Sequence, residues 1–209
     1  MLIKQEQRPT VHLFIDFLVE LHFGPPLDRR GPRHLTRIGD YDMSGSLNDV
    51  LPEPISKENE EVLLALMKQK VKVAAGLSVR LLHAMEERFG PAARQVVQDM
   101  AENIKPKPRK DKGEPEADLS EFCARLDQAC VGSHRWERVI NESDRIGYYY
   151  RRCMFAEIYR ELAEPQLGFV ICAGDEPGVK SYNPKLAFRR TKVLMNGDEL
   201  CDHVFYVQE

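Results

Sequence analysis

Apolar positions recur at helical spacing through the first half of the chain. In residues 10–23 they fall three or four apart, and Gly24-Pro25-Pro26 ends that run. A longer run starts after Ser56, a favourable N-cap, and reaches residue 89, with a continuation or restart after Gly76. Shorter runs occupy residues 92–104 and 118–130. The pattern predicts helices over these ranges and a short one near residues 47–51.

The pattern changes after Gly132. Residues 136–140 and 146–152 are rich in β-branched and aromatic side chains and flank a polar turn, which predicts a β-hairpin. Residues 153–162 are predicted to be helical. Residues 167–173, 186–195 and 201–207 predict three more strands, the last two joined by a tight turn at Asn196-Gly197-Asp198. Helices followed by strands indicate an α+β fold: N-terminal helices packed on a C-terminal, mostly antiparallel sheet of about five strands with one inserted helix.

The spacing of Pro, Gly and charged residues suggests how the chain is divided. We expect an N-terminal helix and irregular arm over residues 1–55 and an α+β domain over residues 56–209. The composition of residues 105–117, which are rich in Pro and charged residues, predicts an internal linker loop. A structureless stretch as long as residues 24–54 is uncommon inside a compact domain, so this arm either wraps the domain or joins copies in a homo-oligomer.

Charge and cysteine usage narrow the functional classes. The 209 residues carry a formal net charge of −3, which gives no electrostatic case for nucleic acid or an anionic membrane. No apolar run approaches the roughly 18 residues that a membrane span needs, and the first ten residues lack the apolar core of a secretory signal. Five cysteines, an odd number at irregular spacing, indicate free thiols in a reducing, cytoplasmic setting.

Cys153 lies where the second hairpin strand ends and the next helix is predicted to begin. Free N–H groups at a helix start would stabilise a thiolate there, and the adjacent Arg151 and Arg152 add positive charge. Cys153 is therefore a candidate nucleophile. The alternative is that its side chain is a small buried hydrophobe, as most cysteines are.

Cys172 and Asp175 form the second candidate pair. Cys172 ends an apolar segment, and Gly174 permits a sharp turn that would return the Asp175 carboxylate toward the thiol. A carboxylate there could act as a general base or bind a substrate amino group. The alternative is a strand end followed by an ordinary polar turn.

The last strand supplies further candidates. Cys201 and His203 should share one face of the strand, while Asp202 points to the other. Asp198 lies in the preceding turn. His203 could serve as a base or a ligand, or lie at the surface of an edge strand.

Arg190 and the cysteines leave two further interpretations open. Arg190 lies mid-strand and, if it points inward, could hold a carboxylate with its guanidinium fork. Cys153, Cys172 and Cys201 could instead be three ligands of a zinc or iron ion. No pair among them has the close spacing of a usual zinc site, so we predict no cofactor and keep the metal as an alternative.

Several sequence blocks resemble the L-2-amino-thiazoline-4-carboxylic acid hydrolase family. The blocks are Arg152-Cys153-Met154-Phe155-Ala156-Glu157, residues 167–175, and Arg190-Thr191 followed by Gly197-Asp198-Glu199-Leu200-Cys201-Asp202. A helix ending in His83-Ala84-Met85-Glu86-Glu87-Arg88-Phe89-Gly90 adds to the resemblance, which spans residues 63–206. The sequence contains no GxGxxG, Walker A, GxSxG or HExxH motif that would indicate another enzyme class.

The resemblance implies a hydrolase that acts on a non-peptide carbon–nitrogen bond. The activity that names the family opens the ring of 2-amino-thiazoline-4-carboxylate, a small cyclic amidine, to a carbamoyl-cysteine. On this basis we expect Cys153, or next Cys172, to be the nucleophile and Asp175 or Asp202 to be the base. Arg190, with Asp198, Cys201 and His203, would bind the small-molecule substrate. The alternatives are a non-catalytic module that binds a small molecule or a metal, and an interaction subunit.

Overall fold

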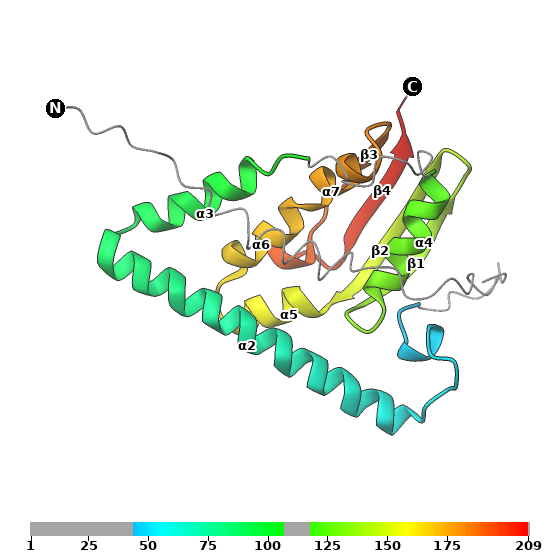
Figure 1. Ribbon diagram of the computed structural model, residues 1–209, viewed down its shortest axis with the longest axis horizontal. Helices are drawn as coiled ribbons and strands as arrows, with labels where there is room; N and C mark the ends of the chain where they lie inside the picture. The colour runs from blue at the N-terminus through cyan, green and yellow to red at the C-terminus, as the bar shows by residue number, and fades with distance from the viewer. Residues whose placement is uncertain (1–43, 107–117, 209) are drawn as a thin grey trace.

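The computed structural model describes residues 44–106 and 118–208 (Figure 1). The helices are η1 (Leu47–Asp49), α2 (Lys57–Phe89), α3 (Ala92–Glu102), α4 (Leu119–Cys130), α5 (Met154–Glu161), α6 (Pro165–Ala173), α7 (Asp175–Tyr182) and η2 (Leu194–Asn196). The strands are β1 (His134–Asn141), β2 (Arg145–Cys153), β3 (Leu186–Arg189) and β4 (Cys201–Val207). The helix predicted at residues 10–23, most of the arm at 24–54 and the linker at 107–117 lie outside the described residues.

The four strands form one antiparallel sheet in the order β1-β2-β4-β3. In β4, Cys201, His203 and Phe205 pair with Tyr150, Tyr148 and Ile146 of β2, so all six share one face of the sheet. Helix α4 covers this face, with the Phe122 ring 5.2 Å from the Phe205 ring. The α+β class and the β1–β2 hairpin are confirmed, and the sheet has four strands in the described part of the chain, where about five were expected.

One of the expected strands is a helix, α6, in the structure. Residues 167–173 were predicted to be a strand, but Pro165–Ala173 is helical, with Pro165 in the first turn. Such an uninterrupted apolar run has no periodicity, so its spacing cannot distinguish a buried strand from a buried helix. Pro165, which suits the start of a helix, was the available signal.

Two neighbouring predictions are also wrong. Helix α7 begins at Asp175, where a polar turn was expected. The strand predicted for residues 186–195 ends at Arg189, and Asn196-Gly197 closes η2 with Gly197 in the left-handed region (φ 98°). Asn-Gly therefore ends a short helix within a long connection from β3 to β4. The two strands still pair.

Helix α2 is one continuous element of 33 residues, so the chain does not restart after Gly76. The Ser56 side chain caps it by accepting a hydrogen bond from the Asn59 N–H, and Gly90 ends it with a positive φ of 73°. Helix α3 then folds back and contacts α6 (Figure 1). None of the helices in the described residues is both long and apolar enough to cross a membrane.

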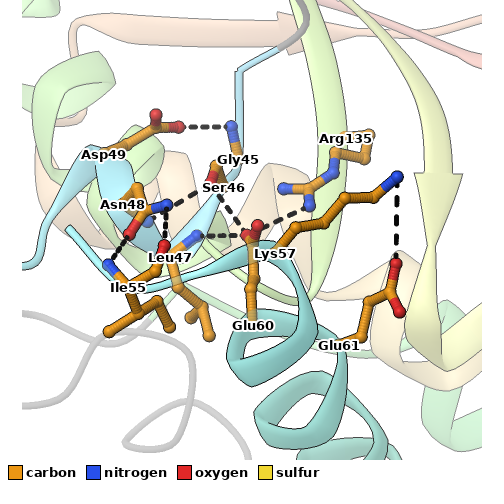
Figure 2. Close-up of polar contacts among 10 residues, drawn as sticks. All are labelled: Gly45, Ser46, Leu47, Asn48, Asp49, Ile55, Lys57, Glu60, Glu61 and Arg135. Atoms are coloured by element: carbon orange, nitrogen blue, oxygen red, sulfur yellow. Dashed lines mark hydrogen bonds and ion pairs between the residues drawn. The ribbon is translucent and has the colours of Figure 1, made fainter.

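The last part of the N-terminal arm is fastened to the domain by Glu60. Its Oε1 accepts hydrogen bonds from Ser46 Oγ and the Leu47 N–H, each 2.8 Å long, and lies 3.4 Å from Arg135 of β1 (Figure 2). Ser44 adds a backbone bridge to Trp136. Residues 44–47 therefore lie against the domain.

Candidate functional site

An ion pair between Arg190 and Asp175 organises the candidate site. Asp175 is the first residue of α7, and Arg190 follows directly after β3. The Arg190 guanidinium pairs with the Asp175 carboxylate through Nη1 and donates a 2.8 Å hydrogen bond from Nη2 to the Cys172 carbonyl. Its carbon lies 5.6 Å from the ring centres of both Phe169 and Phe188. Arg190 thus points inward, while Arg189 is exposed.

The Asp175 carboxyl has a pKa suited to proton transfer near neutrality. Burial raises its pKa to about 6, against the opposing charges of Arg190 and His134. The side chain nevertheless keeps 31% of its surface exposed, compared with 13% for Arg190. The carboxylate is thus closely surrounded by protein but still reachable from solvent. A base with a pKa near the working pH can both take up and release a proton.

Cys153 occupies the predicted position but not the predicted protonation state. It is the N-cap of α5, and the N–H groups of Phe155 and Ala156 stabilise its thiolate. Burial outweighs them and raises the pKa of the thiol to about 11. The two arginines that were expected to stabilise the thiolate are engaged elsewhere, because Arg151 pairs with Glu137 and Arg152 pairs with Glu157.

The other two candidate thiols are also protonated at neutral pH. Burial, followed by the charge of Asp175, raises the pKa of Cys172 well above its usual value. Burial raises the pKa of Cys201 to about 11, although its sulfur accepts a 3.2 Å hydrogen bond from the Leu194 N–H. Cys153 also contributes to both shifts, so the three thiols lie within electrostatic reach of one another. Yet no set of three His, Cys, Asp or Glu side chains in the described chain is arranged to hold a metal ion.

His134 belongs to this group, although the sequence analysis did not single it out. It pairs directly with Cys153 across the β1–β2 hairpin. Burial alone would lower the pKa of His134, but the neighbouring Cys130 and Asp175 raise it overall. His134 and Cys153 both lie just outside the predicted strands 136–140 and 146–152, and extending that hairpin in register was the available signal.

Ser133 lies beside the imidazole of His134. Its hydroxyl oxygen is 3.1 Å from the Cys130 carbonyl oxygen and 2.8 Å from His134 Nδ1, and it can donate its one hydrogen to only one of them. The Cys130 side chain also hydrogen-bonds to His134 and helps to raise its pKa. A neutral imidazole keeps one unprotonated nitrogen, so His134 can act as a base.

His203 shares the inner face of the sheet but has a different environment. Its ring lies 4.8 Å from that of Tyr150 and 5.0 Å from that of Phe188. Burial, with the nearby charges of Arg190 and His134, lowers the pKa of His203 to about 3. It therefore stays neutral, and its Nε2 is buried without a hydrogen-bond partner among the described residues.

Asp202 and Asp198 lie away from this group and hold the β3–β4 connection in place. The Asp202 carboxylate accepts hydrogen bonds from the backbone N–H groups of Thr191 (2.7 Å) and Lys192 (2.6 Å) and from the Thr191 hydroxyl. Asp198 accepts from the Val193 N–H at 2.6 Å. As predicted, Asp202 faces away from Cys201 and His203. The structure gathers the other six predicted residues: Cys153, Cys172, Asp175, Arg190, Cys201 and His203.

A hollow of about 490 Å³ lies elsewhere, at the end of the sheet between Arg145, Arg189 and Tyr206. Its lining contains no thiol and no imidazole. We therefore place the candidate site at Asp175 and Arg190, where residues capable of nucleophilic and acid–base chemistry converge.

Comparison with known proteins identifies one family to which the chain is similar. A family model described as L-2-amino-thiazoline-4-carboxylic acid hydrolase matches residues 70–205. The match runs from the middle of α2 into β4 and includes every residue of the candidate site. No curated protein and no solved structure matches the chain.

Proposed function

Because the chain belongs to the L-2-amino-thiazoline-4-carboxylic acid hydrolase family, we propose that it hydrolyses a non-peptide carbon–nitrogen bond in a small cyclic amidine of the thiazoline type. The observation that carries this proposal is the Asp175–Arg190 pair, with Cys153, Cys172 and His134 around it. Asp175, with a pKa of about 6, would serve as the base beside the candidate nucleophiles.

The charges of the pair suit a substrate that carries both signs. A protonated amidine would be attracted by the Asp175 carboxylate, and a substrate carboxylate by the Arg190 guanidinium. Phe169 and Phe188 flank the guanidinium and offer apolar surface to a ring. A 2-amino-thiazoline-4-carboxylate has an amidine and a carboxylate on one small ring, so it fits this arrangement.

The reaction would proceed through a covalent adduct on Cys153. Because its thiol is protonated at neutral pH, a base must take the proton, and His134, which lies opposite Cys153 in the strand pairing, is the candidate. The sulfur then attacks the amidine carbon. The ring carbon–nitrogen bond breaks, and the ring nitrogen receives the proton from His134.

Water completes the cycle. Asp175, as the carboxylate, removes a proton from a water molecule, whose oxygen attacks the same carbon. The bond to Cys153 breaks, and the sulfur recovers its proton from Asp175. One substrate and one water give one ring-opened product, and the protein returns to its starting state. In this scheme Asp202 and Asp198 shape the β3–β4 connection instead of acting as bases.

The test is turnover of 2-amino-thiazoline-4-carboxylate by the full chain, followed by mass spectrometry. We expect a product heavier by one water, and loss of about 100-fold or more in kcat/KM for Cys153→Ser and for Asp175→Asn. Cys123→Ala is the matched control, because Cys123 lies in the core beside Tyr148. Circular dichroism would verify that each variant folds.

Each contrary outcome has a definite meaning. Full activity in Cys153→Ser but not in Cys172→Ser would transfer the nucleophile role to Cys172. Full activity in both cysteine variants and in Asp175→Asn would rule out this site. Tight binding without turnover, measured by calorimetry, would instead favour the non-catalytic binding module.

A further inference from the structure

Helix α2 has apolar side chains on two opposite faces. The inner face packs into the core through Ala75, Val79 and Leu82. The outer face carries five apolar side chains that are 50–66% exposed among the described residues: Val62, Leu66, Val73, Leu77 and Leu81. Their separations of four and seven residues place them on one side of the helix. We call these five residues the outer stripe.

Gly76 lies beside the outer stripe and has no explanation within the described part of one chain. A glycine inside a helix is less favourable than an alanine because it loses more backbone freedom on folding. A Cβ added at Gly76 would meet nothing within 4 Å, so packing within the described chain does not require the glycine. The absence of a side chain does permit another backbone to approach closely at this point.

We propose that the outer stripe of α2 binds the outer stripe of a second copy of this chain in an antiparallel helix pair. Four of the five apolar positions are symmetric along the helix; the fifth, Val73, lies close to the midpoint. Val62 and Leu81 lie equally far from the midpoint between residues 71 and 72, and so do Leu66 and Leu77. An isologous dimer requires such a self-complementary surface. In the pair, Val62 packs against the partner's Leu81, and Leu66 against the partner's Leu77, over about 28 Å.

The helix dipoles and the acidic first turns favour the antiparallel orientation over a parallel one. The first turns of α2 carry Glu58 and Glu61, whereas its last turns carry both signs, with Arg88 beside Glu86 and Glu87. A parallel pair would place Glu58 and Glu61 beside their own copies, with like charges together. An antiparallel pair separates these acidic groups and also aligns the helix dipoles favourably.

This surface differs from the oligomer contact that the sequence suggested at residues 24–54, and it is independent of the proposed chemistry. The test is the mass of the full chain in solution by light scattering. We expect twice the 24.0 kDa chain mass, and the single-chain mass for the double variant Leu66→Lys/Leu77→Lys. The control Val139→Lys changes an exposed apolar residue on β1 and should leave the dimer intact.

Cross-linking distinguishes an antiparallel pair from a parallel one. It also distinguishes a second copy of the chain from other segments that could cover the outer stripe. Val73→Cys lies near the two-fold axis and should form a linked peptide pair between two copies on mild oxidation. Val62→Cys should link to Leu81→Cys in a mixture of the two variants but not to itself. Self-linking of Val62→Cys would overturn the antiparallel pairing. A monomeric full chain would overturn the dimer and would leave residues 1–43 of the same chain as the occupant to examine.

Discussion

Asp175 combines two opposing influences in one carboxyl group. Burial favours the neutral acid, while Arg190 and His134 favour the carboxylate, and together they leave the pKa at about 6. Near neutral pH, the ionised form therefore predominates and the protonated form is readily reached. That balance depends on Arg190, which is held in place by the Cys172 carbonyl and by two aromatic rings.

The proposed role of Asp175 predicts the pH dependence of the reaction. A base works in its deprotonated form, so kcat/KM should rise as pH increases through about 6, where Asp175 ionises, and level off only when His134, whose pKa is raised above its usual value, is also neutral. Arg190→Gln removes a charge that lowers the pKa of Asp175, so the rising limb should move to higher pH. A pH–rate profile of both proteins measures this shift. If the rising limb of the profile does not move in Arg190→Gln, the titration belongs to another group. The control is His203→Gln, which should leave the limb where it is in the native chain.

Burial also explains which single-residue predictions succeeded. The position of Cys153 at the start of a helix followed from the change in sequence pattern, and α5 confirms it. The predicted thiolate is not found, because burial raises the pKa of the thiol and because Arg151 and Arg152 are paired with Glu137 and Glu157. His134 acquires its place only through strand pairing with Cys153.

At the scale of elements, helix α6 shows the limit of apolar periodicity. Its residues are apolar on nearly every side because α3, α5, α7 and η2 all contact it. A surface helix such as α4 has only one apolar face, and this periodicity correctly predicted a helix over residues 118–130. The fully apolar element, which brings Cys172 to the site, was therefore the harder one to predict.

A buried charge network joins these elements away from the site. Glu164, in the turn between α5 and α6, is 6% exposed. Arg94 of α3 donates to it from Nη1 at 2.8 Å and from Nη2 at 2.7 Å, and also binds Glu86 of α2. His83 of α2 lies 2.7 Å from the same carboxylate. One carboxylate thus fixes α2 and α3 to the start of α6.

This network predicts the cost of neutralising Glu164. Glu164→Gln should lower the free energy of unfolding by about 1.5–3 kcal/mol, the usual range for hydrogen bonds to a charged group. Urea denaturation measures this cost. Glu161→Gln is the matched control, since Glu161 pairs with Lys68 and Lys72 on the surface and its loss should change stability little.

The effect should also depend on pH. Arg94, and after it His83, lower the pKa of Glu164 from 4.5 to about 2. A carboxyl with a depressed pKa stabilises the fold above its unfolded value and loses that contribution as pH falls. The gap in stability between the native chain and Glu164→Gln should therefore narrow from about pH 4.5 downward. A gap that stays constant between pH 4.5 and 2 would contradict the assigned ion pairs.

At the scale of the molecule, the class of fold could be predicted and the arrangement of its elements could not. Helix and strand periodicities gave the α+β class, the hairpin and the long helix. The strand order β1-β2-β4-β3 places β4 beside β2, across the inserted helices α5, α6 and α7. That long-range pairing brings Cys201 and His203 next to Tyr150, and no local pattern specifies it.

The attachment of the arm at Glu60 is another such long-range contact, and it gives the last prediction. Glu60 fixes Ser46 and Leu47 and approaches Arg135, so Glu60→Ala removes three contacts at once (Figure 2). We expect backbone amides in residues 44–51 to exchange hydrogen about tenfold faster or more, because bonds to a charged acceptor are lost. Amides of β2 and β4 should be unaffected, since local opening need not involve the sheet.

Glu61→Ala is the control for this experiment. Glu61 is the next residue of α2, and its Oε1 lies 4.0 Å from Lys57 Nζ at the surface. Figure 2 draws this ion pair. Its removal should leave the exchange of the arm unchanged. If Glu60→Ala leaves the amide of Leu47 as protected as in the native chain, other contacts of the arm must hold it. The bridge from Ser44 to Trp136 and the 3.0 Å hydrogen bond from the Gly132 N–H to the Gly45 carbonyl are the ones to test next.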